Sequence, residues 1–199
     1  MKTATAMFTS AALLLASAAA QAQIAALTDD EVMLIGMAVS LTRTGGTEKA
    51  AVLPSETSNL GCEGRAPVTL GGCPGAMRTA KVQPDDVLAW LSRQFPDASP
   101  EVIADFREKA QNSAIVSRPL PINIMQTIGE QGATDPALQP AFVLDFSRVG
   151  FNPAKTEAIV YIAGVSQNEP KRSYGEYLYL RNDAGTWKVA ARARNWSFQ

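Results

Sequence analysis

The sequence contains no histidine and only two cysteines among its 199 residues. Without histidine the chain cannot build a Ser-His or Cys-His dyad, an imidazole general base or a histidine-based zinc site. This excludes the commonest classes of secreted hydrolase. The sequence also lacks a G-x-S-x-G, an S-x-x-K, a P-loop and a G-x-G-x-x-G motif. We therefore predict no catalytic residues, no metal ligands and no cofactor.

Long apolar runs are also scarce, and the longest lies at the N-terminus. It follows Lys2, is rich in alanine, and ends at the small-x-small sequence Ala20-Gln21-Ala22, which is typical of a secretory signal with its cleavage site. The run is too short for a membrane span, which needs roughly 20 residues. We expect residues 1–22 to be a signal peptide, residues 23–199 to form a single domain without a membrane span, and the protein to be periplasmic or secreted.

Positive charge is not in excess, since 18 basic residues face 19 acidic ones and the formal net charge is −1. A nucleic-acid-binding protein is expected to carry a basic footprint. We therefore expect no nucleic-acid partner.

The two cysteines, Cys62 and Cys73, lie within a stretch at 47–75 where glycine and proline interrupt every periodic pattern. In an exported protein this spacing predicts a local disulfide. A redox role would normally use a C-x-x-C motif, and a metal site would need further ligands nearby.

Three helices are predicted before residue 115. Thr28-Asp-Asp-Glu31 has the form of a capping box, in which the threonine and the glutamate satisfy each other's backbone N–H groups, and it begins a helix that ends near Gly45-Gly46. This helix is apolar nearly all round, so we expect it to be deeply packed. The acidic triplet could also be imagined as a metal site, but its first-turn position favours capping. Two amphipathic helices begin at Pro84 and at Ser99.

The C-terminal part of the chain predicts an antiparallel sheet of about four strands. They cover Ala141–Val149, Thr156–Val165, Tyr174–Arg181 and Thr186–Trp196, and the last two are joined by a hairpin turn at Asn182–Gly185. We therefore predict an α+β fold in which the N-terminal helices pack on this C-terminal sheet.

Several short motifs follow one another along the predicted strands: Phe146-Ser-Arg-Val-Gly-Phe151, Thr156-x-Ala158-x-Val160-Tyr161, Gly175-x-Tyr177-x-x-Leu180, Gly185-x-Trp187-Lys-Val189 and Asn195-Trp196-Ser197. The series resembles an uncharacterised group of exported bacterial α+β proteins, and the resemblance extends weakly to Asp105-Phe106-x-x-Lys109. It implies the fold of the sheet and export from the cytoplasm, but it supplies no functional residues. The charged connection Glu169-Pro-Lys-Arg172 and the cysteine loop depart from the group's pattern.

Two tyrosines and two arginines of the last hairpin are candidates for a ligand-binding surface: Tyr177, Tyr179, Arg192 and Arg194. Whether these side chains share a face depends on the register of the hairpin, because a shift of one residue exchanges the two faces of a strand. One register places the tyrosines beside basic residues, and the other places them in the core with Trp187 and Val189.

These observations predict an exported, non-catalytic α+β module that binds a small ligand or a protein partner. The middle strands are apolar on both faces, so a homodimer or a protein partner bound through a sheet face is one way to cover them. The alternative is an exported hydrolase that uses carboxylates, which would need two acidic groups opposed across a cleft. The adjacent pair Asp85 and Asp86 does not favour it, since both lie at a helix start where electrostatics already explain them.

Overall fold

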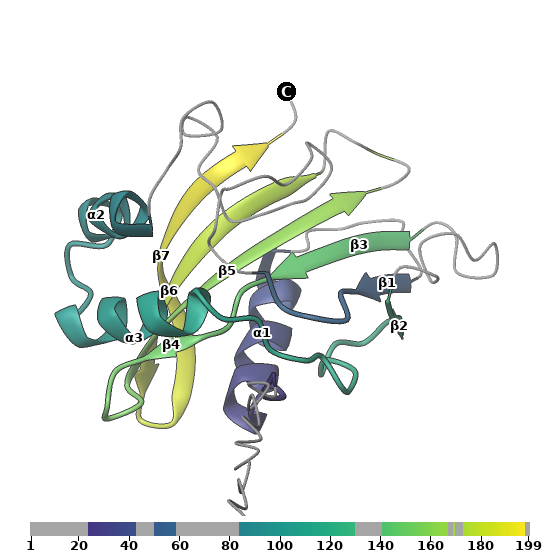
Figure 1. Ribbon diagram of the computed structural model, residues 1–199, viewed down its shortest axis with the longest axis horizontal. Helices are drawn as coiled ribbons and strands as arrows, with labels where there is room; N and C mark the ends of the chain where they lie inside the picture. Colours follow the sequence, from purple (N-terminus) through teal and green to yellow (C-terminus); the bar gives the residue numbers. More distant parts are fainter. Residues whose placement is uncertain are drawn as a thin grey trace, which may run out of the picture.

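The computed structural model describes residues 24–42, 50–58, 84–129, 141–166, 169 and 173–197. This part of the chain forms three helices and seven strands, so the fold is α+β (Figure 1). The helices are α1 (Asp29–Thr42), α2 (Pro84–Gln94) and α3 (Pro100–Ala110). The strands are β1 (Ala50–Leu53), β2 (Met125–Ile128), β3 (Ala141–Phe146), β4 (Gly150–Phe151), β5 (Glu157–Ser166), β6 (Tyr174–Asp183) and β7 (Thr186–Ser197).

The strands belong to one mixed sheet in the order β2-β1-β3-β5-β6-β7, with the short β4 paired to β5. β1 runs parallel to both β2 and β3, whereas all the other pairs are antiparallel. The prediction of about four antiparallel strands was therefore wrong in number, and the sheet is not purely antiparallel. The four predicted strands correspond to β3, β5, β6 and β7, and the additional strands are short pieces of two to four residues.

Buried residues on the two faces of the central strands belong to two different clusters. On one face, Val160 and Ile162 of β5 and Leu178 of β6 cluster with buried residues of α1. On the other face, Tyr161 and Tyr177 cluster with buried residues of α2 and α3. Figure 1 shows the corresponding arrangement, with α1 behind the sheet and with α2 and α3 together at one side. Each face of the central strands thus contributes to a buried cluster that also contains residues of the helices.

The helix starts follow the predicted capping chemistry. The Glu31 carboxylate accepts a hydrogen bond from the Thr28 N–H at 3.0 Å, and the Thr28 hydroxyl accepts one from the Glu31 N–H at 3.3 Å, which confirms the capping box. At the start of α3 the Ser99 hydroxyl accepts a hydrogen bond from the Val102 N–H, and Pro100 is the first helical residue.

The last hairpin has a register that differs from both of those considered from the sequence. Its turn is only two residues long, with Ala184 and Gly185 both at positive φ (49° and 86°), as the tightest hairpin turns require. Leu180 then pairs with Val189, but Tyr179 pairs with Ala191, so Ala190 is an extra residue in β7. This bulge exchanges the two faces of the strand beyond it.

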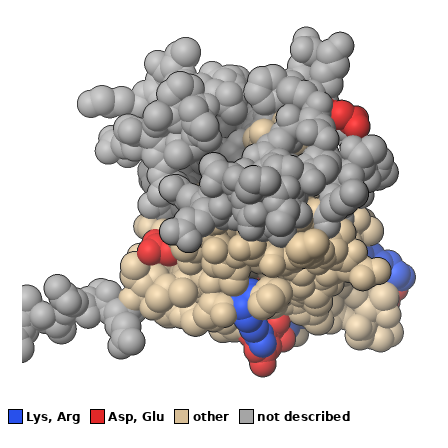
Figure 2. Space-filling model, turned by 90° about the vertical axis from the view of Figure 1, so that its right-hand side faces the viewer, with Lys and Arg blue, Asp and Glu red and all other residues tan. Residues whose placement is uncertain are grey.

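The opposite end of the sheet has exposed apolar residues. On the edge strand β2, Met125 is 55% exposed and Ile128 is 36% exposed. This end of the molecule faces the viewer in Figure 2, and its described part carries few charged side chains.

The predicted signal peptide and the cysteines Cys62 and Cys73 lie outside the described residues, so cleavage, export and the disulfide stay predictions. None of the helices in the described part of the chain is long and apolar enough to cross a membrane.

Candidate functional site

The structure does not bring the four residues of the predicted ligand surface together. Tyr177 and Tyr179 are buried, at 0% and 1% exposure, in the cluster that also contains residues of α2 and α3. Arg192 pairs with Leu178 and Arg194 with Glu176, so both arginines point to the other face of the sheet. The bulge at Ala190 is the physical reason, because it turns Ala191 and Ala193 toward the tyrosines.

Both tyrosines are held by contacts in the protein core. Burial raises the pKa of Tyr177, and the neighbouring Tyr161 adds to the effect. Burial also raises the pKa of Tyr179, whose hydroxyl donates to the Glu157 carboxylate and lies 3.1 Å from the Asp97 carbonyl oxygen. Burial alone would raise the pKa of Glu157 as well, but hydrogen bonds from Ser99 and Tyr179 outweigh it and the pKa is lowered. This network ties the start of α3 to the sheet.

An apolar groove of about 390 Å³ lies between α2 and α3 and is open to solvent. On each helix the lining residues recur three or four positions apart, so they lie on one side of that helix. The two sides together form the walls of the groove. Residues between the two helices, Pro96 and Ala98, also line it. The lining residues are Leu88, Ser92, Phe95, Pro96, Ala98, Pro100, Ile103, Ala104 and Arg107.

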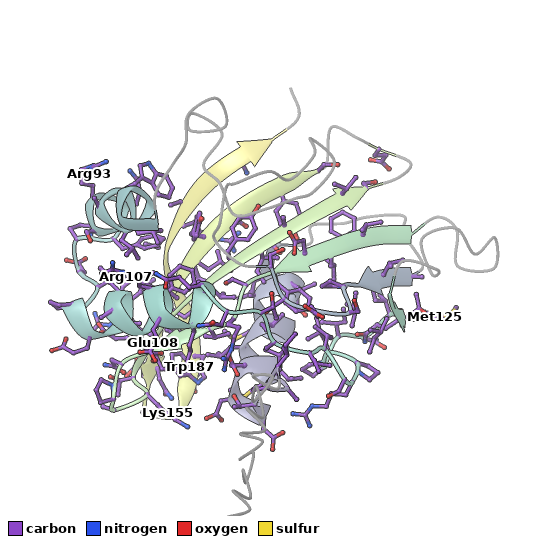
Figure 3. All side chains as sticks on the ribbon, viewed as in Figure 1. Arg93, Arg107, Glu108, Met125, Lys155 and Trp187 are labelled. Carbon is purple, nitrogen blue, oxygen red and sulfur yellow. The ribbon has the colours of Figure 1, made fainter. Side chains whose placement is uncertain are left out.

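The polar groups of this groove are few and lie at its rim. Ser92 donates its hydroxyl hydrogen to the Leu88 carbonyl oxygen at 3.0 Å within α2. Arg107 is exposed on α3, on the side that faces α2 (Figure 3). The groove therefore combines an apolar floor with one guanidinium group, whose five N–H donors suit a carboxylate or another anion.

The Ser-Arg-Val-Gly-Phe motif has a structural role that the sequence did not reveal. Glu31, which is 1% exposed, accepts hydrogen bonds from Arg148 Nε at 3.0 Å and from the Val149 N–H at 3.4 Å. Burial alone would raise the pKa of this carboxyl, but the hydrogen bonds from Arg148 and Thr28 outweigh it and the pKa is lowered. The motif thus joins the start of α1 to the sheet through a buried ion pair.

The same motif contacts the distant Asp105-Phe106-x-x-Lys109 sequence of α3. Asp105 accepts a hydrogen bond from the Phe151 N–H at 2.6 Å, and the Lys109 ammonium lies 5.0 Å from the centre of the Phe151 ring. A Cβ atom at Gly150 would lie 2.4 Å from the Phe106 Cα, so only glycine fits where α3 crosses β4. The Phe146–Phe151 motif and the Asp105–Lys109 segment therefore form one contact between α3 and β4.

Another ion pair lies at the C-terminal end of α1. Arg192 donates to Glu176 at 3.4 Å and to the Leu41 carbonyl oxygen at 3.2 Å. Burial raises the pKa of Glu176, and the charges of Arg192 and Arg194 offset this effect only in part. Arg192 therefore supplies the positive charge that the C-terminal carbonyl groups of a helix favour.

The carboxylates that the structure describes show no arrangement typical of a hydrolase. Glu31 is bound by Arg148, Glu176 by Arg192, and the buried Asp145 accepts a hydrogen bond from the Ser58 hydroxyl. A pocket of about 260 Å³ does contain Glu101 and Asp105, but both stand one turn apart on α3 and form a single wall. Within the described residues, no group of three or more acidic or cysteine side chains could hold a metal ion.

Sequence reasoning missed the groove because it is made by two helix faces at once. The sequence predicts two amphipathic helices, and the helical spacing of Pro100, Ile103, Ala104 and Arg107 is the signal for the side of α3 that lines the groove. The angle between the two helices, which opens the groove, cannot be derived from either stripe. Comparisons of the chain with protein-family models, with curated proteins and with solved structures gave no match.

Proposed function

We propose that the protein is an exported, non-catalytic α+β module that binds a small amphiphile in the groove between α2 and α3. The observation that carries this proposal is the groove itself, with its apolar lining and the guanidinium group of Arg107 at its rim. Its volume of about 390 Å³ falls within the range of small-molecule sites, which is roughly 300–1,000 Å³.

The lining indicates the chemical class of the ligand. An apolar chain or ring laid along Pro100, Ile103 and Ala104, which are at least partly exposed, would remove apolar surface from water, which is the main source of affinity for such sites. An anionic head would lie near Arg107, where an exposed ion pair adds selectivity more than affinity. A fatty acid is the simplest molecule with both parts.

The packing of the helices supports a binding role for this surface. We infer that α2 and α3 cover one face of the sheet with their buried sides, so that Phe95 belongs both to the core and to the groove floor. A ligand would therefore lie on a rigid base, which lowers the ordering cost of binding. The predicted signal peptide and the family resemblance support a periplasmic or secreted location.

Titration calorimetry with dodecanoate tests the proposal. Ala104 is exposed and lines the groove, so Ala104→Trp fills it at little cost to folding. We expect this variant to bind dodecanoate more weakly by over about tenfold, which corresponds to a loss of only about 1.4 kcal/mol of apolar contact.

The matched control is Glu108→Trp, which adds the same side chain at an exposed position of α3 that does not line the groove (Figure 3). It should bind as the unmodified protein does. If the unmodified protein binds no dodecanoate, or if the two tryptophan variants behave alike, the groove is not the site. The charge preference is measured with dodecyltrimethylammonium, which has the same chain and a cationic head and should bind less tightly than dodecanoate.

A further inference from the structure

Part of the groove is made by the turn between α2 and α3 and by the residue that follows this turn. The turn includes Ser99, which caps the N-terminus of α3. The lining residues that come from this segment are Phe95, Pro96, Ala98 and Pro100. The shape of this part of the groove therefore depends on what holds the turn in place.

The turn is held to the sheet through Glu157 on β5. One carboxylate oxygen of Glu157 accepts a hydrogen bond from the Ser99 N–H at 3.3 Å, and the other accepts one from the Tyr179 hydroxyl. The Tyr179 hydroxyl also lies 3.1 Å from the Asp97 carbonyl oxygen. Asp97 and Ser99 are the two neighbours of Ala98, which lines the groove. Glu157 itself is half-buried and does not line the groove.

We propose that Glu157 positions the turn and thereby sets the shape of the groove, so that ligand binding depends on the ionised form of this carboxyl group. The inference rests on the function proposed above. An ionised carboxylate only accepts hydrogen bonds, so it can hold the Ser99 N–H and the Tyr179 hydroxyl at the same time. A protonated carboxyl group or an amide carries a donor of its own, which would face one of these two donors.

The groups that face Glu157 from neighbouring elements are both charged and neutral. Arg181 lies opposite Glu157 in the pairing of β5 with β6. Asp97 is a second carboxylate near the Tyr179 hydroxyl, and the Asn152 side-chain amide donates to Glu157 at 3.4 Å. Burial and the neighbouring Glu157 raise the pKa of Tyr179, so its hydroxyl keeps its proton and remains a donor.

These contacts determine the pH range in which the turn is anchored. Burial alone would raise the pKa of Glu157, but the hydrogen bonds from Ser99 and Tyr179 outweigh it and the pKa is lowered. A carboxyl group with a lowered pKa contributes its stabilisation above its usual pKa of about 4.5 and loses it as the pH falls through the lowered value. The anchor is therefore complete at neutral pH and is released in acid.

Titration calorimetry with decanesulfonate tests the proposal, because a sulfonate, unlike dodecanoate, keeps its charge in acid. At pH 7 we expect Glu157→Gln and Tyr179→Phe to bind it more weakly by about three- to tenfold, since each removes hydrogen bonds to a charged group without changing the groove lining. Tyr174→Phe is the matched control, because it removes a tyrosine hydroxyl that lies 2.7 Å from the Thr42 hydroxyl, outside the groove. It should bind as the unmodified protein does, and circular dichroism should show every variant folded.

The pH dependence of binding separates positioning from a general effect on stability. Binding by the unmodified protein should weaken as the pH falls from about 4.5, whereas Glu157→Gln should lack this change and Asp97→Asn should keep it. The proposal is overturned if Tyr179→Phe and Tyr174→Phe weaken binding equally, or if Glu157→Gln keeps the pH dependence. Equal binding by all variants overturns this inference alone, whereas an unmodified protein that binds no decanesulfonate overturns the proposed groove function as well.

Discussion

The buried ion pair between Glu31 and Arg148 gives the most quantitative prediction. In the variant Arg148→Ala, the Glu31 carboxylate loses hydrogen bonds of 3.0 Å and 3.3 Å together with the positive charge that lies beside it. The Thr28 and Val149 N–H groups remain, at 3.0 Å and 3.4 Å. A carboxylate that is 1% exposed is then left with two neutral backbone donors and the threonine hydroxyl.

Breaking a buried pair by removing one partner costs about 3–5 kcal/mol. The Arg148 side chain is 17% exposed, so water can reach the edge of the site and the lower end of this range applies, about 3 kcal/mol. For a domain of this size, each kcal/mol lowers the melting temperature by about 2–4 °C, so the expected fall is about 6–12 °C.

Urea and thermal unfolding at pH 7 measure this loss directly. Arg148→Lys should lie between the unmodified protein and Arg148→Ala, because lysine keeps the charge but loses the planar fork of donors. The matched control is Arg118→Ala, which removes an arginine from an exposed pair with Asp29 and should change stability little. If Arg148→Ala costs less than about 1 kcal/mol, the assignment of this pair as a buried structural contact is wrong.

Two further variants test other contacts of the fold. Gly150→Ala places a Cβ atom 2.4 Å from the Phe106 Cα and should destabilise the protein by about 1–3 kcal/mol in urea unfolding, and an effect below about 0.5 kcal/mol would contradict the close crossing of α3 over β4. Glu176 has a raised pKa because it is buried, so the unmodified protein should lose stability as the pH rises from about 4.5 through the folded-state pKa of this group. Glu176→Gln should lack this loss, and an unchanged pH profile would show that Glu176 is solvated.

Local chemistry explains which parts of the fold were predictable. The capping box of Thr28 and Glu31 depends on residues three positions apart and is confirmed. The helix start predicted at Ser99 is confirmed as well, because the Ser99 hydroxyl accepts a hydrogen bond from the Val102 N–H. The strand β1 could not be predicted, because its four residues are stabilised by parallel pairing with β2 and β3, more than 70 residues away in the sequence. Nothing in Ala-Ala-Val-Leu distinguishes such a strand from a short apolar loop.

The ligand surface predicted on the last hairpin failed because the position of a bulge could not be predicted. Alternation along β7 predicts that Trp187, Val189, Ala191 and Ala193 share one face. The extra residue Ala190 divides this set, so that Trp187 and Val189 pack on the side of α1 while Ala191 and Ala193 pack on the side of α2 and α3. A single bulge thus separates the arginines from the tyrosines, and the sequence contains no glycine that marks its position.

Nuclear magnetic resonance with isotopically labelled protein tests ligand binding in the α2–α3 groove, because it locates the ligand. Dodecanoate is added stepwise and the change in each backbone amide signal is followed. Binding in the α2–α3 groove predicts that the largest changes lie between Leu88 and Arg107 and that they saturate together as expected for one site. Largest changes between Met33 and Leu41, or changes spread evenly over the protein, would contradict it.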